Sequence, residues 1–145
     1  MKKIYNDYIP FKGFIAMLWL WWLFVRNDLK HKVTEKVERH ESVHSYQQVC
    51  IFIADIILVS VLAIFTNASW YWLLLSAFSP LILYVICWII EILLPPYNRA
   101  YKDICFESEA KYLEDDPNWK KKVFPFSFVM YIPNKDYGKS INKKK

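Results

Sequence analysis

Two long apolar blocks, residues 49–65 and 70–94, constrain the fold of this 145-residue chain more than any other feature. A helix needs roughly 20 apolar residues to cross a hydrocarbon core of about 30 Å, and the two blocks lie on either side of that length. A polar break over residues 66–69 separates them, and no Gly or Pro occurs between Thr34 and Ser79. The pattern predicts a mainly α fold with a helical hairpin in the membrane.

Two acidic residues leave a second interpretation of these blocks open. Asp55 and Glu91 lie inside them and are costly in lipid, which favours the core of a large soluble helical domain instead. The charge pattern favours the membrane. The net charge is +5, and the basic residues lie outside the apolar blocks, where they would meet anionic headgroups. A nucleic-acid binder would have Lys and Arg interleaved with a soluble core, so we expect lipid and not nucleic acid as a partner.

The connector at residues 66–69 contains no charge, whereas both flanks of the hairpin are rich in Lys and Arg. The positive-inside rule therefore predicts a multi-pass membrane protein with both termini cytoplasmic. We expect one domain over residues 1–145, in which residues 34–65 form a helix that runs into the first membrane segment and residues 70–94 form the second.

The remaining segments are shorter. Phe14–Val25 is too short to span a membrane, so we expect residues 1–33 to form strands, with a short β-hairpin and a turn at Arg26-Asn27-Asp28, or an interfacial segment. Residues 99–123 should form a helix to Glu114 and then a short basic helix. The rest, 124–145, has the composition of an aromatic and then disordered tail.

The feature with chemical content is His40-Glu41-Ser42-Val43-His44, on the predicted helix that Thr34 would cap. A spacing of four puts both imidazoles on one helix face, so they can bind one Zn²⁺ ion. Glu41 is then placed to act as general base on the attacking water in a zinc hydrolase.

Zinc needs a third protein ligand, and the sequence offers several. Glu107 and Glu109 follow the second apolar block, which would return them to the side of the histidines. Cys105 and His31 are further candidates. Of the two glutamates only one can face the histidines, and we expect Glu109 to lie on the solvated surface.

The sequence allows more than one role for other polar residues near the motif. Asp103 lies four residues before Glu107, where it can accept the second N–H of a zinc-bound histidine or be an exposed helix acid. We expect Gln47 to mark the water interface. Tyr97, Tyr101 and Tyr112 are available to stabilise an oxyanion, and nothing in the sequence selects among them.

The layout His40-Glu41-x-x-His44, membrane hairpin, Glu107-x-x-Ala110 resembles gluzincin metallopeptidases, in particular the membrane peptidases related to the CAAX prenyl endopeptidase and HtpX. The resemblance implies that His40, His44 and Glu107 are the metal ligands and that Ala110 allows close packing against the zinc helix. Lys111 stands where the family has an Asp that orients a histidine. A second likeness, through Ile9-Pro10-Phe11-Lys12-Gly13 and the segment 101–110, is to small bacterial proteins without a known substrate.

Three hypotheses follow. In the first, the chain is a membrane-associated zinc metallopeptidase that hydrolyses a peptide or protein substrate. In the second, zinc binds without turnover, because a chain of this length has little left to build a substrate cleft. In the third, the chain is a helical membrane protein without metal that acts by contact with partners.

Overall fold

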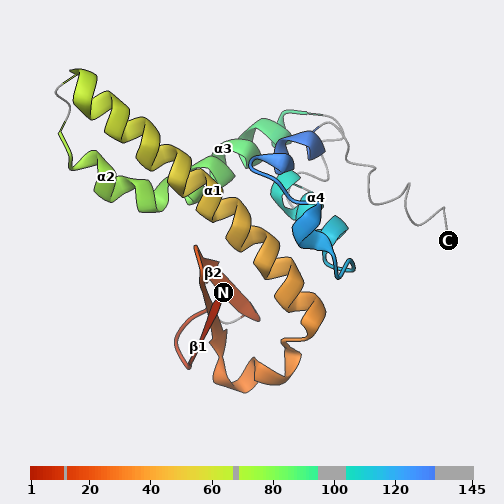
Figure 1. Ribbon diagram of the computed structural model, residues 1–145. Coiled ribbons are helices and arrows are strands. Elements are labelled where there is room, and N and C mark those ends of the chain that lie inside the picture. Colours follow the sequence, from red (N-terminus) through yellow and green to blue (C-terminus); the bar gives the residue numbers. More distant parts are fainter. Residues whose placement is uncertain (12, 67–68, 95–103, 133–145) are drawn as a thin grey trace.

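The structure is a computed structural model that describes residues 1–11, 13–66, 69–94 and 104–132. It is mainly helical, with a small sheet at the N-terminus, as the sequence predicts (Figure 1). One long helix, α1, runs through the whole molecule. The sheet lies along its first half, and the other helices pack against its middle or project with its second half.

The N-terminal sheet has three strands and not the two of the expected hairpin. They are β1 (Lys2–Asn6), β2 (Ala16–Trp19) and β3 (Trp22–Arg26), in the order β1-β3-β2. β3 pairs in parallel with β1 and antiparallel with β2. β2 is therefore an edge strand. The apolar block ends at Arg26-Asn27-Asp28 as expected, but a 3-10 helix, η1 (Asn27–Lys32), begins there instead of a single turn, and the hairpin turn lies earlier, between β2 and β3.

The hairpin turn at Leu20 is held by α1 and not by a turn sequence. Leu20 adopts a φ of 54°, in the left-handed region that favours Gly or Asn. Its backbone N–H donates to Gln48 Oε1 at 2.6 Å, and its carbonyl accepts from Ser45 Oγ at 2.6 Å. Its side chain is buried. Contacts with a distant helix thus stabilise a turn that no local residue signals.

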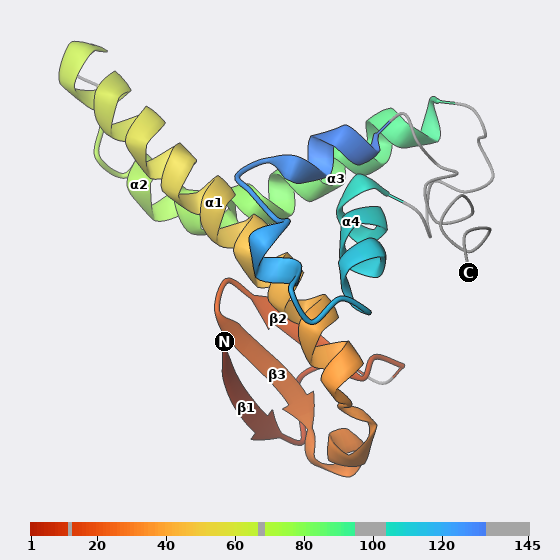
Figure 2. The same ribbon diagram turned by 45° about the vertical axis from the view of Figure 1, so that its right-hand side comes forward.

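Helix α1 (Glu35–Thr66) has 32 residues, about 48 Å at 1.5 Å per residue. Its N-terminus is capped by Thr34, whose Oγ1 accepts from the N–H of Val37 at 3.4 Å. The first half packs between the sheet and α4, and the second half projects beyond them (Figure 2).

The second apolar block forms α2 (Trp72–Leu75), a 3-10 turn η2 (Ser76–Phe78) and α3 (Ser79–Ile92). Pro80 lies in the first turn of α3, where its missing N–H costs no hydrogen bond within the helix. α3 crosses α1, and Cys87 packs in one buried cluster with Ile51.

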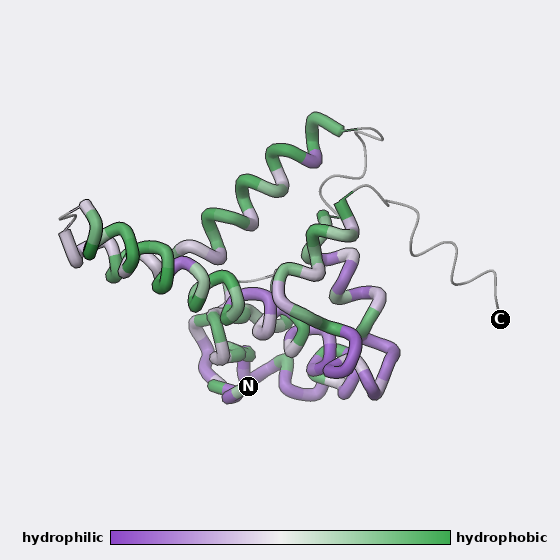
Figure 3. Tube along the Cα trace, turned by 45° about the horizontal axis from the view of Figure 1, so that its top comes forward, coloured by the Kyte–Doolittle hydropathy of each residue, from purple (hydrophilic) through white to green (hydrophobic). Residues whose placement is uncertain are grey.

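Glu35–Thr66 and Trp72–Ile92 are both long and apolar enough to cross a membrane. Figure 3 shows that hydrophobic residues dominate the projecting arms, whereas the part around the N-terminus is mostly hydrophilic.

The chain then forms α4 (Cys105–Leu113), η4 (Trp119–Lys121) and η5 (Ser127–Tyr131). The helix expected from residue 99 is not continuous to Glu114, because Ile104 has extended geometry and α4 begins at Cys105; residues 99–103 lie outside the described part. The expected short basic helix is reduced to the single 3-10 turn η4.

The predicted tail is wrong for residues 124–132, which fold back onto α4. The ring of Phe128 stacks on that of Phe106 with centroids 4.1 Å apart, and both side chains are buried. The sequence misleads here because the aromatic residues of this segment occur without helical or strand periodicity.

A hydrogen bond between Glu91 and the backbone of Cys105 accounts for the acid in α3 and for the position at which α4 begins. The side chain of Glu91 is completely buried, and its Oε1 accepts a hydrogen bond from the backbone N–H of Cys105 at 2.8 Å. This N–H is one of the first in α4, which have no partner within the helix. The contact joins α3 to α4 two residues before Glu107.

We expect Glu91→Leu to lower the free energy of unfolding by about 1–3 kcal/mol, since it leaves the buried N–H of Cys105 without an acceptor. Glu91→Gln retains a carbonyl acceptor and should lose less. Thermal unfolding of the purified protein in detergent measures both. A Glu91→Leu protein as stable as wild type would show that this contact does not position α4.

Candidate metal centre

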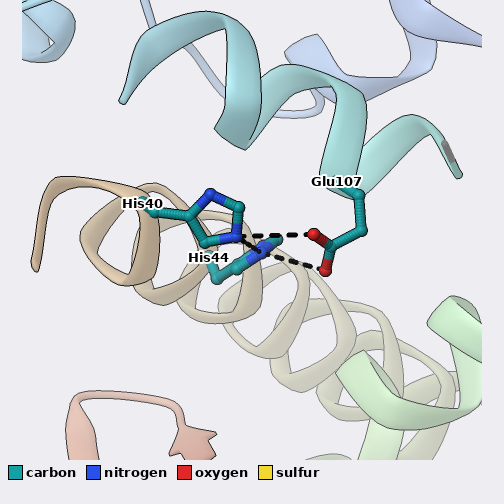
Figure 4. Close-up of side chains that lie close together, drawn as sticks. All are labelled: His40, His44 and Glu107. Atoms are coloured by element: carbon teal, nitrogen blue, oxygen red, sulfur yellow. Dashed lines mark hydrogen bonds and ion pairs between the residues drawn. The ribbon is translucent and has the colours of Figure 1, made fainter. Parts of the chain in front are cut away.

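Helix α4 crosses α1 so that Glu107 faces His40 and His44 (Figure 4). Glu107 Oε2 lies 3.4 Å from His40 Nε2, and Glu107 Oε1 lies 3.2 Å from His44 Nε2. The two Nε2 atoms are 3.1 Å apart, with the rings nearly perpendicular at 82°. All three residues are partly buried, and together they form a group that can hold a metal ion.

The spacing of the three donors fits an ion of the size of zinc. Zinc lies about 2.0–2.2 Å from nitrogen and oxygen ligands, which puts the ligand atoms of a tetrahedral site about 3.3–3.6 Å apart. The separations of 3.1, 3.2 and 3.4 Å are close to this. Three protein ligands would leave the fourth position open, as in catalytic zinc sites.

Apolar packing sets this distance between the helices. Val43, on α1, and Ala110, on α4, are both fully buried and belong to one cluster with Leu113, Trp119 and Val123. Ala110 lies one turn beyond Glu107, and its small side chain lets the backbones approach. A larger residue there would push Glu107 away from the histidines.

The pKa of Glu107 lies well below its usual range. Burial alone would raise that pKa, but the hydrogen bonds with His40 and His44 outweigh it. The carboxyl group is therefore ionised at neutral pH, the form in which it ligates a metal.

The other sequence candidates for the third ligand lie elsewhere. Burial raises the pKa of the Cys105 thiol, so it stays protonated at neutral pH and is a poor ligand. His31 lies in η1 and is exposed. Glu109 does not face the histidines, but the expectation that it is solvated is wrong: it is 1% exposed and bonded to Gln47 and Ser127.

Sequence reasoning missed Glu114, which binds the other nitrogen of His40. Its Oε2 lies 2.9 Å from His40 Nδ1, and its Oε1 lies 3.0 Å from Lys36 Nζ. Glu114 follows Glu107 by seven residues, two helical turns, so the spacing itself was a signal. The resemblance placed the acid that orients a histidine at position 111. In this chain a carboxylate reaches His40 from Glu114, about one turn further along.

His44 also has a partner on its second nitrogen. Gln47, expected at the water interface, is 3% exposed, and its Oε1 lies 2.8 Å from His44 Nδ1. Both histidines therefore direct Nε2 toward Glu107 and hold Nδ1 against a residue behind the site. Such contacts fix the orientation of an imidazole ligand.

A cavity of about 740 Å³ opens beside the three residues, and Glu41 lines it together with His40 and His44. Tyr84, from α3, also lines it. Asp103, Tyr97 and Tyr101 lie outside the described residues. Tyr112 packs near Tyr131 and does not border the cavity.

A scan against models of protein families and searches of curated proteins and of solved structures found no match to this chain.

We expect Glu114→Gln to weaken zinc binding by about 10–100-fold, the usual effect of losing a residue that orients a metal-bound histidine. Competition with a chelator measures the affinity. Asp115→Asn is the matched control, because Asp115 shares Lys36 with Glu114 but is exposed and does not touch His40. Equal losses in the two variants would assign the effect to the Lys36 ion pairs instead.

Proposed function

We propose that this chain is a membrane-associated zinc metallopeptidase in which His40, His44 and Glu107 bind the metal and Glu41 is the general base. The observation that supports this most is the convergence of these residues from α1 and α4 at the wall of one cavity. Zinc bound there would acidify a water molecule and polarise a peptide carbonyl.

Glu41 is next to His40 in sequence and lines the same cavity, which places its carboxylate beside the open side of the site. From there it takes a proton from the attacking water and passes it to the leaving amine. Glu107 and Glu114 add negative charge around the histidines, which favours a bound metal cation. The cavity also answers the concern that so short a chain has no cleft, and so favours a hydrolase over a zinc site without turnover.

A peptide substrate suits the shape of the cavity. All four residues of the edge strand β2 line it, and β2 pairs only with β3 among the described strands. An extended peptide can add to such an edge through backbone hydrogen bonds. Much of the remaining lining is apolar and would accommodate an apolar side chain; it includes Ile51, Ala77, Phe78, Pro80, Leu81 and Phe106.

The apolar surface of the projecting arms supports association with a membrane. Ile64 and Phe65, near the end of α1, are 66% and 82% exposed, and Leu74 on α2 is 71% exposed. Exposure of such surface to water costs about 25 cal/mol per Å², and lipid removes that cost. Glu91 was an argument for a soluble core, because an acid in a membrane helix is costly. Its hydrogen bond from the backbone N–H of Cys105 offsets part of that cost and so weakens the argument.

The resemblance to gluzincin peptidases of the CAAX prenyl endopeptidase and HtpX type supports the same proposal. It assigns the ligands to His40, His44 and Glu107, the three residues that lie together. The departure at Lys111 no longer argues against it, because Glu114 supplies a carboxylate to His40.

Substitution of the general base separates a hydrolase from a zinc protein without turnover. Glu41→Gln should keep zinc and lose peptide cleavage by about 10²–10⁴-fold, since proton transfer contributes that much. Mass spectrometry of a peptide mixture measures the cleavage. Glu38→Gln, on the same helix but bonded to Lys3, is the control. A zinc-loaded wild type that cleaves nothing would favour the non-catalytic zinc-binding protein.

The proposed topology places both termini in the cytoplasm and the connector at residues 66–69 on the far side. In a variant without the native cysteines, Ser69→Cys should react with a membrane-impermeant maleimide added to intact cells. Asp115→Cys, exposed and near the metal centre, should react only after the membrane is opened. The reverse pattern would contradict the orientation, and labelling of both in intact cells would contradict the hairpin.

A further inference from the structure

A buried polar network contacts His44 on the Nδ1 side of its ring. It consists of Gln47 from α1, Glu109 from α4 and Ser127 from η5, which are 3%, 1% and 3% exposed. Burial of polar side chains is costly unless each finds partners. The network joins three segments that are far apart in the sequence, and among the described residues it meets the metal centre at the hydrogen bond between Gln47 and His44.

The hydrogen bonds of Gln47 determine which way its amide points. Gln47 Nε2 donates to Glu109 Oε2 at 2.8 Å and to the carbonyl of Phe106 at 3.2 Å. Both partners are acceptors, so the amide nitrogen must face them and the amide oxygen must face His44. That oxygen lies 2.8 Å from His44 Nδ1. Ser127 completes the network, because its hydroxyl donates to Glu109 Oε1.

This arrangement determines the tautomer of His44. The oxygen of Gln47 can only accept, so Nδ1 of His44 must bear the proton that it accepts. The lone pair of a neutral His44 is then on Nε2, the atom that faces Glu107. If the amide of Gln47 turned over, its NH₂ would face His44 and its oxygen would face Glu109. Glu109 and the Phe106 carbonyl therefore prevent that inversion.

We infer that Gln47 and Glu109 are positioning residues for the metal centre: Glu109 fixes the amide of Gln47, which fixes Nε2 of His44 toward the metal. The inference rests on the proposed zinc site. The two histidines would then be oriented by different groups. The carboxylate of Glu114 contacts His40, and the amide of Gln47 contacts His44. The inference also ties residues 127–131 to the metal centre through Ser127.

The first test compares two neighbouring glutamines on α1. Gln47→Leu removes the acceptor for His44 and should weaken zinc binding by about 10–100-fold. Gln48→Leu makes the same chemical change one position along, but Gln48 binds the backbone N–H of Leu20 and no histidine. Its zinc affinity should stay close to wild type, even if its unfolding temperature falls. Chelator competition and thermal unfolding of the metal-free proteins separate the two effects.

The second test exchanges the pair. Gln47→Glu alone sets two carboxylates against each other, and Glu109→Gln alone removes the acceptor that orients the amide of Gln47. Both single variants should bind zinc more weakly than wild type. The double variant Gln47→Glu/Glu109→Gln again places an acceptor against His44 Nδ1 and an amide against that acceptor, although the Phe106 carbonyl loses its donor. It should bind zinc more tightly than either single variant and approach the visible spectrum of the cobalt-substituted wild type. A role in folding alone predicts no such recovery of affinity.

The outcomes distinguish this inference from the proposed function. A wild-type protein that binds no zinc would overturn both. A wild type that binds zinc no more tightly than Gln47→Leu would overturn the positioning role and leave the zinc site intact. If Gln47→Leu does not fold, the exchanged pair decides, because it conserves side-chain volume. Failure of a folded double variant to regain affinity would overturn the role of Glu109.

Discussion

The packing of α4 across α1 is the interaction on which the rest of the structure depends. It brings an acid from one helix to two histidines of the other, and it is fixed at both ends of the short helix. At its start, Glu91 of α3 binds the backbone of Cys105; at its end, Glu114 binds His40 and Lys36. Between them Ala110 packs with Val43, which sets the separation of the helices. A metal ligand on a helix held in this way has little freedom to move, which is what a metal centre requires.

The histidines and the buried acids around the site share one feature: each has a hydrogen-bond partner that fixes its orientation. Each histidine presents Nε2 to Glu107 and has a hydrogen-bond partner on Nδ1, so both rings are oriented before any metal binds. Two buried acids follow the same rule. Glu91 and Glu109 are buried because each binds a donor that packing leaves without water. Among the described residues, the second half of α1 and α2 contain no part of this network, and their exposed apolar surface is what lipid would cover.

Sequence reasoning succeeded where local pattern determines structure. The length of α1 and its cap at Thr34 follow from the absence of Gly and Pro and from the capping residue, and the two apolar helices follow from the length of the apolar blocks. The pairing of His40 with His44 follows from helical spacing. It failed where distant contacts decide. The turn at Leu20 depends on Ser45 and Gln48, and the burial of Glu109 depends on Ser127, eighteen residues further along the chain. Glu114 was missed because the family pattern directed attention to Lys111, although a spacing of seven from Glu107 indicated the same helix face.

X-ray absorption at the zinc edge of the purified, zinc-loaded protein tests the central claim most directly, because it reports the ligand atoms themselves. The account predicts a shell of nitrogen and oxygen atoms at about 2.0–2.2 Å, with two imidazoles and no sulfur. In Glu107→Gln the combined nitrogen and oxygen shell should weaken while the signal of the two imidazoles remains. A sulfur shell near 2.3 Å would place Cys105 or another cysteine on the metal and contradict the assignment. So would a spectrum with fewer than two imidazoles, or a wild-type protein that retains no zinc.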